Sequence, residues 1–412
     1  MTLLRGLPLT LVVGFGLACT PLGCTSDVDR GENAVGALAA VPVTPIKLQA
    51  IGNCWAYATA AWVESLHKGA TDETLDVSEA YITYYSWLKK ITQDNADDAD
   101  RDEIGTGASW GKAVEILRRY GVYTGAFVPG DKQREGGDRQ QAALDAINAS
   151  LVSGPLKTLD ARRDKVLVRR ELNRAWRLPS DLVAKLDHAF GPDGETTFLN
   201  TATKHGLPLV RVDELPVRSR DPGTGGLGTF SLADVIGARR QGGTWDDRTG
   251  RLAWSVAQPP VAPDEQRAFV RRIQRALHEG TAVPLTWNID PLRIRPDGSF
   301  TGKTTRKLTW HPHLSVVIDY QVDAPPFGVL PAGTPETRSA ALAAALSDHA
   351  RVEFLRVKNS WGTAPVGRAT EFAGTDDLYM DYLFDVAPAC TEGEPSTCGN
   401  WINLVAAVLP PE

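Results

Sequence analysis

Cysteine is scarce in this sequence, with only five among 412 residues. Cys19 and Cys24 lie near the start of the chain, which leaves Cys54, Cys390 and Cys398 for the remainder. The Cys-x-x-Cys pairs and the His-Glu-x-x-His segment that commonly hold zinc are absent. We therefore expect neither a metal nor an organic cofactor. A metal site built from Cys54 and histidines 311 and 313 is the alternative.

Long apolar runs are lacking after residue 24, so we expect no membrane-spanning helix there. Residues 1–24 contain Arg5 and then the apolar run Leu7–Ala18, which is too short and too glycine-rich to span a bilayer. We interpret them as an export signal. The segments that end at Cys19 and Cys24 resemble the lipobox of bacterial lipoproteins, so lipidation of either cysteine would anchor the protein to a membrane. Release as a secreted or periplasmic protein and a buried N-terminal helix are the alternatives.

An excess of positive charge is also lacking, because 44 Lys and Arg face 50 Asp and Glu for a net charge of −6. This argues against nucleic acid as a partner but selects no substrate. In an exported protein, three cysteines suggest one disulfide and one free thiol. Cys390 and Cys398 flank a polar, turn-rich loop and are the natural pair. Cys54 is then the unpaired cysteine and a candidate reactive thiol.

Composition divides the chain into segments. The stretch before residue 46 is small, polar and interrupted by proline, as in linkers. Between about 130 and 262, charged helix-prone stretches give way to prolines and a glycine-rich run, which indicates an insertion. We expect an export signal at 1–24, a linker at 25–45, a helical part at 46–129, the insertion at 130–262 and a β-rich part at 263–412.

Helical periodicity dominates the earlier segments. Trp55, Ala58, Trp62 and Leu66 recur at helical spacing, and we expect Gly69 to end that helix. Further helices are predicted at Ser78–Lys90, Trp110–Tyr120, Gln140–Leu151, Arg162–Trp176, Asp264–Gly280 and Thr337–His349. Strands are predicted at Ala282–Ile289, Leu314–Tyr320 and Val352–Lys358. Helices first and strands later predict an α+β protein with two unlike halves.

The segment Gly52-Asn53-Cys54-Trp55 opens the first helix. Free backbone N–H groups at a helix start stabilise a thiolate and lower the thiol pKa, so Cys54 is a candidate nucleophile. We expect Asn53 to cap the helix. A buried, inert cysteine is the alternative reading of this tetrapeptide.

A cysteine nucleophile needs a base held in one orientation. Among the seven histidines, His311 and His313 enter the predicted strand at Leu314. The segment Lys358-Asn359-Ser360-Trp361-Gly362 follows the next predicted strand. The Asn359 oxygen can accept a hydrogen bond from an imidazole, and Trp361 can shield that bond from water. Taken singly, such a histidine is commonly a polar rim residue.

Together these segments resemble the papain family of cysteine peptidases. The family pattern of Cys-Trp, then His with Tyr seven residues later, then Lys-Asn-Ser-Trp-Gly-Thr is matched in that order from Cys54, from His313 and over residues 358–363. The resemblance implies a two-lobed fold, with a helical N-terminal lobe, a β-rich C-terminal lobe and the active-site cleft between them, plus a large helical insertion. It also implies Cys54 as nucleophile, His313 as base and Asn359 as the residue that orients the base.

Weaker similarities lie between these segments. Gly107 and Ala108 correspond to the family's Gly-Gly motif, which binds the substrate backbone, and with Trp361 they are the expected substrate-binding residues. The insertion makes the chain resemble the bleomycin hydrolase and aminopeptidase C branch in particular, although Gly-Asn-Cys-Trp is also similar to calpains. The family has an oxyanion-hole Gln six residues before the Cys, whereas Gln49 stands five before Cys54. We assign Gln49 this role and infer a one-residue deletion.

The sequence therefore predicts a cysteine peptidase that hydrolyses peptide or protein substrates through an acyl-thioester intermediate. A protein that kept the fold and only binds a partner is one alternative. An acyl transferase is another, because transfer to an amine and hydrolysis share the thioester.

Overall fold

The computed structural model describes residues 41–93, 103–129, 136–195, 206–237, 239–241, 244–246, 250–304, 312–362, 374–385, 387–391 and 394–412. The predicted export signal with Cys19 and Cys24, most of the linker, and His311 lie outside the described residues. Two units are distinguished, Met1–Ala34 and Val35–Glu412, and every element below belongs to the second.

The helix that carries Cys54 is α1 (Cys54–Thr71), whose buried face includes Trp55, Trp62 and Leu66. The prediction that Gly69 ends this helix is wrong. A side chain at Gly69 would meet Arg218 at 3.3 Å, so this glycine allows another segment to approach closely. The helix ends instead where Asp72 adopts a left-handed conformation with φ 61°.

Two more helices pack on α1, and both match the sequence prediction closely. Helix α2 (Glu79–Thr92) begins after Ser78, whose side chain accepts a hydrogen bond from the Tyr81 N–H. Helix α4 (Trp110–Tyr120) ends at Gly121, which has a positive φ of 75°. Both helices bury aromatic side chains against α1, as in the edge-to-face contact of Trp62 with Trp110.

The predicted insertion contains helices and small hairpins. Its helices are α5 (Gly136–Val152), α6 (Leu159–Arg163), α7 (Lys165–Ala175), α8 (Ser180–Phe190) and α9 (Leu232–Val235). The single helix predicted at Arg162–Trp176 is in fact two, because Asp164 interrupts it and caps α7 through the Leu167 N–H. Helix α8 was not predicted.

Short strands connect the insertion to the rest of the unit. The pairs are β1 (Val122–Tyr123) with β2 (Leu209–Val210), β3 (Pro216–Arg220) with β4 (Leu227–Ser231), and β5 (Arg239–Gln241) with β6 (Thr244–Asp246). Strand β3 packs along α1. Strand β7 (Ser255–Ala257) joins the main sheet. The insertion is therefore hydrogen-bonded to both neighbouring segments.

Among the described residues, the main sheet has eight strands in the order β7-β16-β8-β10-β12-β13-β9, with β11 paired to β10. Its further members are β8 (Val283–Trp287), β9 (Ser299–Phe300), β10 (His313–Asp323), β11 (Val329–Leu330), β12 (Arg351–Lys358), β13 (Thr375–Tyr379) and β16 (Leu404–Leu409). All pairings are antiparallel except β13 with β9. The three predicted strands are confirmed as β8, β10 and β12, which lie at the centre of the sheet.

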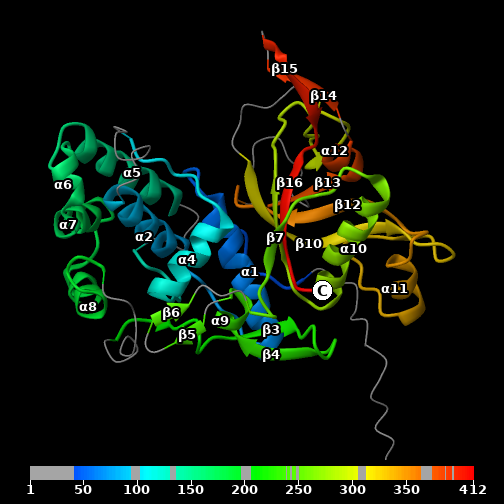
Figure 1. Cartoon of the computed structure of the whole chain (residues 1–412), viewed down its shortest axis with the longest axis horizontal. Coiled ribbons are helices and arrows are strands. Elements are labelled where there is room, and N and C mark those ends of the chain that lie inside the picture. The colour runs from blue at the N-terminus through cyan, green and yellow to red at the C-terminus, as the bar shows by residue number, and fades with distance from the viewer. Residues whose placement is uncertain are drawn as a thin grey trace, which may run out of the picture. The chain divides into compact units, whose positions relative to one another are not determined.

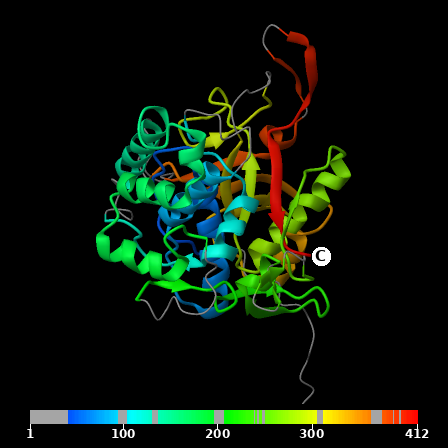
Figure 2. The same ribbon diagram turned by 60° about the vertical axis from the view of Figure 1, so that its left-hand side comes forward.

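The remaining elements are α10 (Pro263–His278), α11 (Ser339–Ala345), α12 (Met380–Phe384) and the hairpin β14 (Ala387–Thr391) with β15 (Glu394–Trp401). Helices α2 and α4 to α8 lie to one side of α1, and the strands of the main sheet lie to its other side (Figure 1). The turned view in Figure 2 shows α10 along the sheet. The predicted α+β fold class is confirmed.

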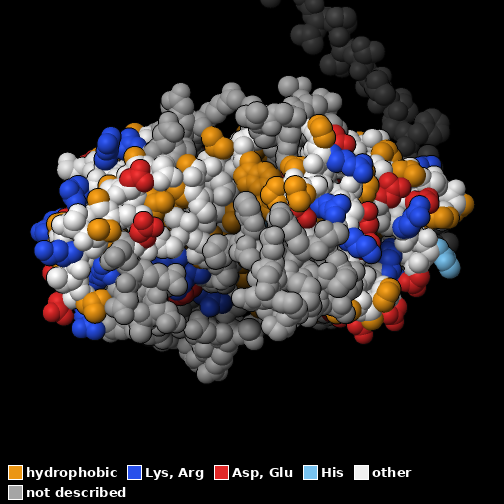
Figure 3. All heavy atoms as spheres, turned by 90° about the horizontal axis from the view of Figure 1, so that it is seen from above, with side chains coloured by type: hydrophobic (Ala, Val, Ile, Leu, Met, Phe, Trp, Pro, Cys, Tyr) orange, Lys and Arg blue, Asp and Glu red, His pale blue; other side chains and the backbone are white. Residues whose placement is uncertain are grey.

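On the face in Figure 3, basic and acidic side chains are interspersed, with hydrophobic side chains near the centre. Within the described ranges, no helix combines the length and the apolar character that a bilayer crossing requires.

Candidate active site

Cys54 is the first residue of α1, as predicted. Its Sγ accepts a hydrogen bond from the Leu314 N–H at 3.5 Å, and Leu314 directly follows His313 in β10. Burial raises the pKa of the Cys54 thiol, although the backbone N–H groups of Leu314, Trp55 and Cys54 itself lower it. The expectation of a lowered thiol pKa is therefore wrong for this state, because desolvation outweighs the helix-start N–H groups.

His313 opens strand β10 and is buried. Its Nε2 lies 2.7 Å from Oδ1 of Asn359. An amide oxygen can only accept, so Nε2 carries the proton and Nδ1 keeps the lone pair that a base needs. Trp287 contacts the imidazole edge-on at 5.6 Å, and Trp361 lies over it at 5.0 Å between ring centroids. Burial lowers the pKa of His313 to about 4, against an opposing effect of the Asn359 hydrogen bond.

The Asn359 side chain follows strand β12 and has three partners. Its Oδ1 accepts from His313 and from the Ser360 N–H at 2.7 Å. Its Nδ2 donates to Oδ2 of Asp376 at 2.6 Å. Asp376 lies in β13 and is 1% exposed. This carboxylate is absent from the predicted site residues, since no motif links a residue in β13 to Asn359.

Gln49 is held beside Asn359, and does not point away into solvent. Its backbone N–H donates to the Ser360 carbonyl at 2.8 Å, and its Oε1 accepts from the Ser360 hydroxyl. Its Nε2 donates to the Ile51 carbonyl at 3.0 Å, which uses one of the two amide hydrogens. The neighbouring Leu48 forms an isolated bridge with Trp361. These contacts attach the loop before Cys54 to the loop after β12.

The expected substrate-binding residues Gly107 and Ala108 lie against the same loop. A side chain at Gly52 would meet Thr106 Oγ1 at 2.6 Å and the Gly107 nitrogen at 4.0 Å. Gly52 therefore has to be small because the two loops touch. Gly107 is exposed, and its carbonyl accepts from Lys90 Nζ at 2.6 Å. Because a carbonyl oxygen has two lone pairs, this one can still accept a second hydrogen bond.

Asn53 does not cap α1, so this expectation is wrong. Its side chain is fully buried, and Nδ2 donates to Thr83 Oγ1 and to Gln140 Oε1, both at 3.1 Å. Gln140 comes from α5 in the insertion, and its Nε2 donates to the Tyr57 hydroxyl at 2.7 Å. Tyr57 in turn donates to the Leu48 carbonyl at 3.2 Å. One side chain of the insertion thus contacts residues on either side of Cys54.

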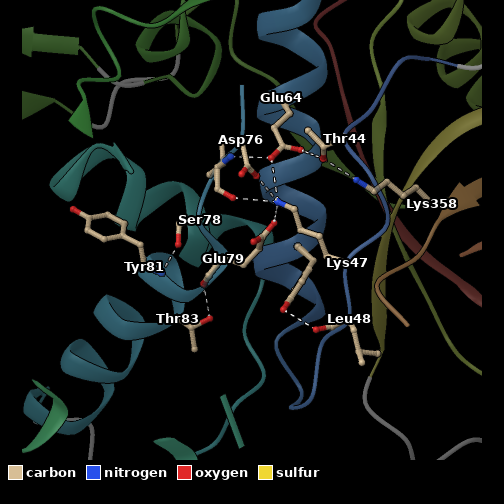
Figure 4. Close-up of polar contacts among 12 residues, drawn as sticks. Thr44, Lys47, Leu48, Glu64, Asp76, Ser78, Glu79, Tyr81, Thr83 and Lys358 are labelled. Carbon is tan, nitrogen blue, oxygen red and sulfur yellow. Dashed lines mark hydrogen bonds and ion pairs between the residues drawn. The ribbon is translucent and has the colours of Figure 1, made fainter. Parts of the chain in front are cut away.

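A buried group of charges lies behind these loops. Figure 4 shows the Lys47 ammonium among three carboxylates, with Nζ at 2.6 Å from Glu79, 3.0 Å from Asp76 and 3.4 Å from Glu64. Burial alone lowers the pKa of Lys47, but these carboxylates raise it well above the ordinary value. Lys47 is therefore cationic, and its ion pairs fix the loop that leads to Gln49 onto α1 and α2.

Lys358 reaches the same group from β12. Its Nζ donates to Thr44 Oγ1 at 3.1 Å, and Thr44 donates to Glu64. Burial lowers the pKa of Lys358 to about 8. A small cavity between α1, β10 and β12 borders both lysines and Asn359. Since Lys358 directly precedes Asn359, the charged group links the strand end that holds Asn359 to the helix that begins at Cys54.

Comparison with known proteins gives the following likenesses. No family model matches this sequence, and no curated protein matches it. Among solved structures, the chain is similar to a cysteine protease of Carica candamarcensis in complex with E-64, at 13% identity and TM-score 0.33, over 90% of this chain and 93% of that one.

Two further structures are similar in the same way. One is the bromelain protease from Ananas comosus with the E64 inhibitor, at 13% identity and TM-score 0.33, over 90% of this chain and 94% of that one. The other is PepW from Lactobacillus rhamnosis, at 13% identity and TM-score 0.39, over 92% of this chain and 82% of that one. All three TM-scores are below 0.5, so nothing about this chain is inferred from these structures.

Proposed function

We propose that this chain is a papain-like cysteine peptidase in which Cys54 is the nucleophile, His313 the base and Asn359 the residue that orients the base. The observation that carries the proposal is the chain of contacts from Cys54 to Asn359. The thiol lies beside the start of β10, and the imidazole there bonds to Asn359 at 2.7 Å with the tautomer that leaves Nδ1 basic. Three residues far apart in sequence supply the parts of one reaction.

The reaction follows from these roles. Nδ1 of His313 takes the thiol proton of Cys54, and the sulfur attacks the carbonyl carbon of the scissile peptide. The oxygen of the tetrahedral intermediate is stabilised by the Cys54 N–H and by the second Nε2 hydrogen of Gln49. The imidazolium then protonates the leaving amine, which leaves a thioester on Cys54. His313 next deprotonates a water that attacks the thioester, and the acid product leaves as the thiol is restored.

Burial favours the neutral forms of both Cys54 and His313. Trp361 and Trp287 exclude water from the imidazole, which strengthens its bond to Asn359. Exposed Gly107, together with Ala108, offers backbone groups for a peptide on one side of the nucleophile. The helices of the insertion favour a relationship to the bleomycin hydrolase and aminopeptidase C branch.

Trapping the acyl-enzyme tests this proposal. The protein is mixed with an activated peptide ester, quenched in acid, and the mass of the Cys54 peptide is measured. We expect an increase equal to the acyl group in the wild type and none in Cys54→Ala. A wild type that binds peptides without acquiring the acyl group would instead be a binding protein. Efficient capture of the acyl group by added amines in preference to water would identify an acyl transferase.

We also propose that the protein is exported, through residues 1–24, as a lipoprotein or a released protein. The antiparallel pairing of β14 with β15 supports the associated disulfide, because Ala389 pairs with Gly399 next to the two cysteines, although the register shifts between Ala389 and Thr391. Intact-mass measurement before and after reduction should differ by about 2 Da, with the change in the peptides of these two cysteines. Two free thiols in exported protein would contradict the pairing.

A further inference from the structure

Asp376 is a buried carboxylate with a defined place beside the candidate site. It lies in β13 opposite Val357 of β12, and its side chain is on the side of the sheet that Asn359 occupies. The next residue, Asp377, faces the other side and forms two hydrogen bonds with Arg356, at 2.7 and 2.9 Å. Two adjacent aspartates in one strand therefore have different roles, and only Asp376 contacts the site.

We propose that Asp376 is a positioning residue that holds the Asn359 amide with its oxygen toward His313. This inference rests on the proposed peptidase function. A carboxylate can only accept, so it selects the amide nitrogen of Asn359. The Ser360 N–H can only donate, so it selects the amide oxygen. A flipped amide would set its oxygen against the carboxylate and its NH₂ group against two donors.

The fixed orientation of the Asn359 amide in turn fixes the protonation of the His313 base. With the amide fixed, His313 keeps its proton on Nε2, and Nδ1 stays available toward Cys54. The groups that contact His313 are Asn359 after β12, Trp287 from β8 and Trp361, and the Cys54 thiol lies against the N–H of the next residue, Leu314. Asp376 adds a negative charge at the far end of this hydrogen-bonded chain. That charge stabilises the imidazolium that forms when the thiol gives up its proton.

Exchanging the two side chains tests the inference. Asn359→Asp alone sets two carboxylates against each other, and Asp376→Asn alone removes the charge and the selection of the amide orientation. In the double variant Asn359→Asp/Asp376→Asn, the new amide donates to the new carboxylate, which still accepts from His313 and Ser360. We expect each single variant to lower the rate of Cys54 alkylation by iodoacetamide at pH 7 by at least about tenfold, and the double variant to recover most of it.

Asp377→Asn is the matched control, because it changes the neighbouring aspartate on the opposite side of the strand. It should leave the alkylation rate within about twofold of the wild type. Equal losses in Asp376→Asn and Asp377→Asn, or a double variant no faster than Asn359→Asp, would overturn the positioning role.

Alkylation also separates this inference from the proposed function. If the wild type cleaves no peptide but the exchange still restores alkylation, the positioning role stands and the peptidase function fails. If the wild type cleaves peptides but the exchange does not restore alkylation, the peptidase function stands and the positioning role fails. Urea unfolding of each variant verifies that it is folded. If Asp376→Asn does not fold, the His313 tautomer in the wild type provides the test instead. The His313 ¹⁵N resonances must then report the Nε2–H tautomer, and the other tautomer would overturn the inference.

Discussion

His313 and Asn359 are joined by a 2.7 Å hydrogen bond although they stand 46 residues apart. The bond forms because β10 and β12 are antiparallel neighbours, so the first residue of one strand meets the residue after the end of the other. Val316 pairs with Lys358, which places Asn359 toward the start of β10. The orientation of the base therefore depends on sheet register as well as on the two side chains.

Separate replacement of His311 and His313 by alanine identifies the base. His313→Ala should lower the turnover rate by at least about 10³-fold, because it removes both the base and the partner of Asn359. His311→Ala should cost much less. Steady-state kinetics on one peptide substrate measures both, with thermal melting to verify folding. Equal losses would contradict the assignment of His313.

Gln49→Ala should lower kcat by roughly 10²–10³-fold with little change in KM, because an oxyanion donor acts mainly in the transition state. The variant also removes the side-chain bonds to Ser360 and Ile51 but keeps the backbone bond to the Ser360 carbonyl, so urea unfolding measures any loss of stability separately from kcat. Gln321→Ala is the control, since Gln321 pairs with Glu353 on the sheet. An unchanged kcat in Gln49→Ala would mean that another group stabilises the oxyanion.

Gln140→Ala should show that the insertion supports the site. Loss of this buried amide removes one hydrogen bond from Asn53 and one from Tyr57, although Asn53 keeps Thr83 and Tyr57 keeps the Leu48 carbonyl. This should lower the free energy of unfolding by about 1–3 kcal/mol and also lower kcat. Gln141→Ala is the matched control, because Gln141 is exposed on the same helix and bonds only to Asp145 among the contacts described for it. Urea titration and peptide kinetics measure both effects, and identical behaviour of the two variants would contradict the prediction.

His278 should make the protein sensitive to acid. Its Nε2 lies 2.6 Å from the Tyr320 hydroxyl, and burial lowers its pKa to about 4. The unfolded chain takes up a proton near pH 6.5, whereas the folded chain does so only near pH 4. The unfolded state therefore binds more protons between these values, and stability falls as the pH drops through that window.

The loss in the free energy of unfolding due to His278 across this pH range is of the order of 3 kcal/mol. His278→Gln should remove this part of the pH dependence, as measured by urea unfolding between pH 7 and pH 4. The exposed His188→Gln serves as control. A wild type and a His278→Gln variant with the same pH dependence would contradict the prediction.

Much of the candidate site could be predicted because its three central residues lie in short, recognisable segments. Cys54 begins a helix with strong periodicity, and His313 and Asn359 adjoin apolar strands that are buried at the centre of the sheet. The supporting residues could not be predicted. Asp376 and Gln140 act through single side-chain contacts across a sheet and between helices, and sequence spacing carries no trace of such contacts.

The errors have physical causes of the same kind. Asn53 looked like a helix cap, but its burial between α2 and α5 gives its amide better partners than the helix N–H groups. Gly69 looked like a helix end, yet it is small because Arg218 packs against it. At both positions, tertiary contacts determine the role of the residue and outweigh its local preference for a helix end.

The most direct test of the proposed function is turnover of a mixed peptide library by the wild type and by Cys54→Ala, followed by mass spectrometry. If Cys54 is the nucleophile, the wild type cleaves a subset of peptides and Cys54→Ala, which keeps the fold and the surface, cleaves none of them. Cleavage of the same peptides by both proteins, or by neither, would contradict the assignment of this chain as a cysteine peptidase.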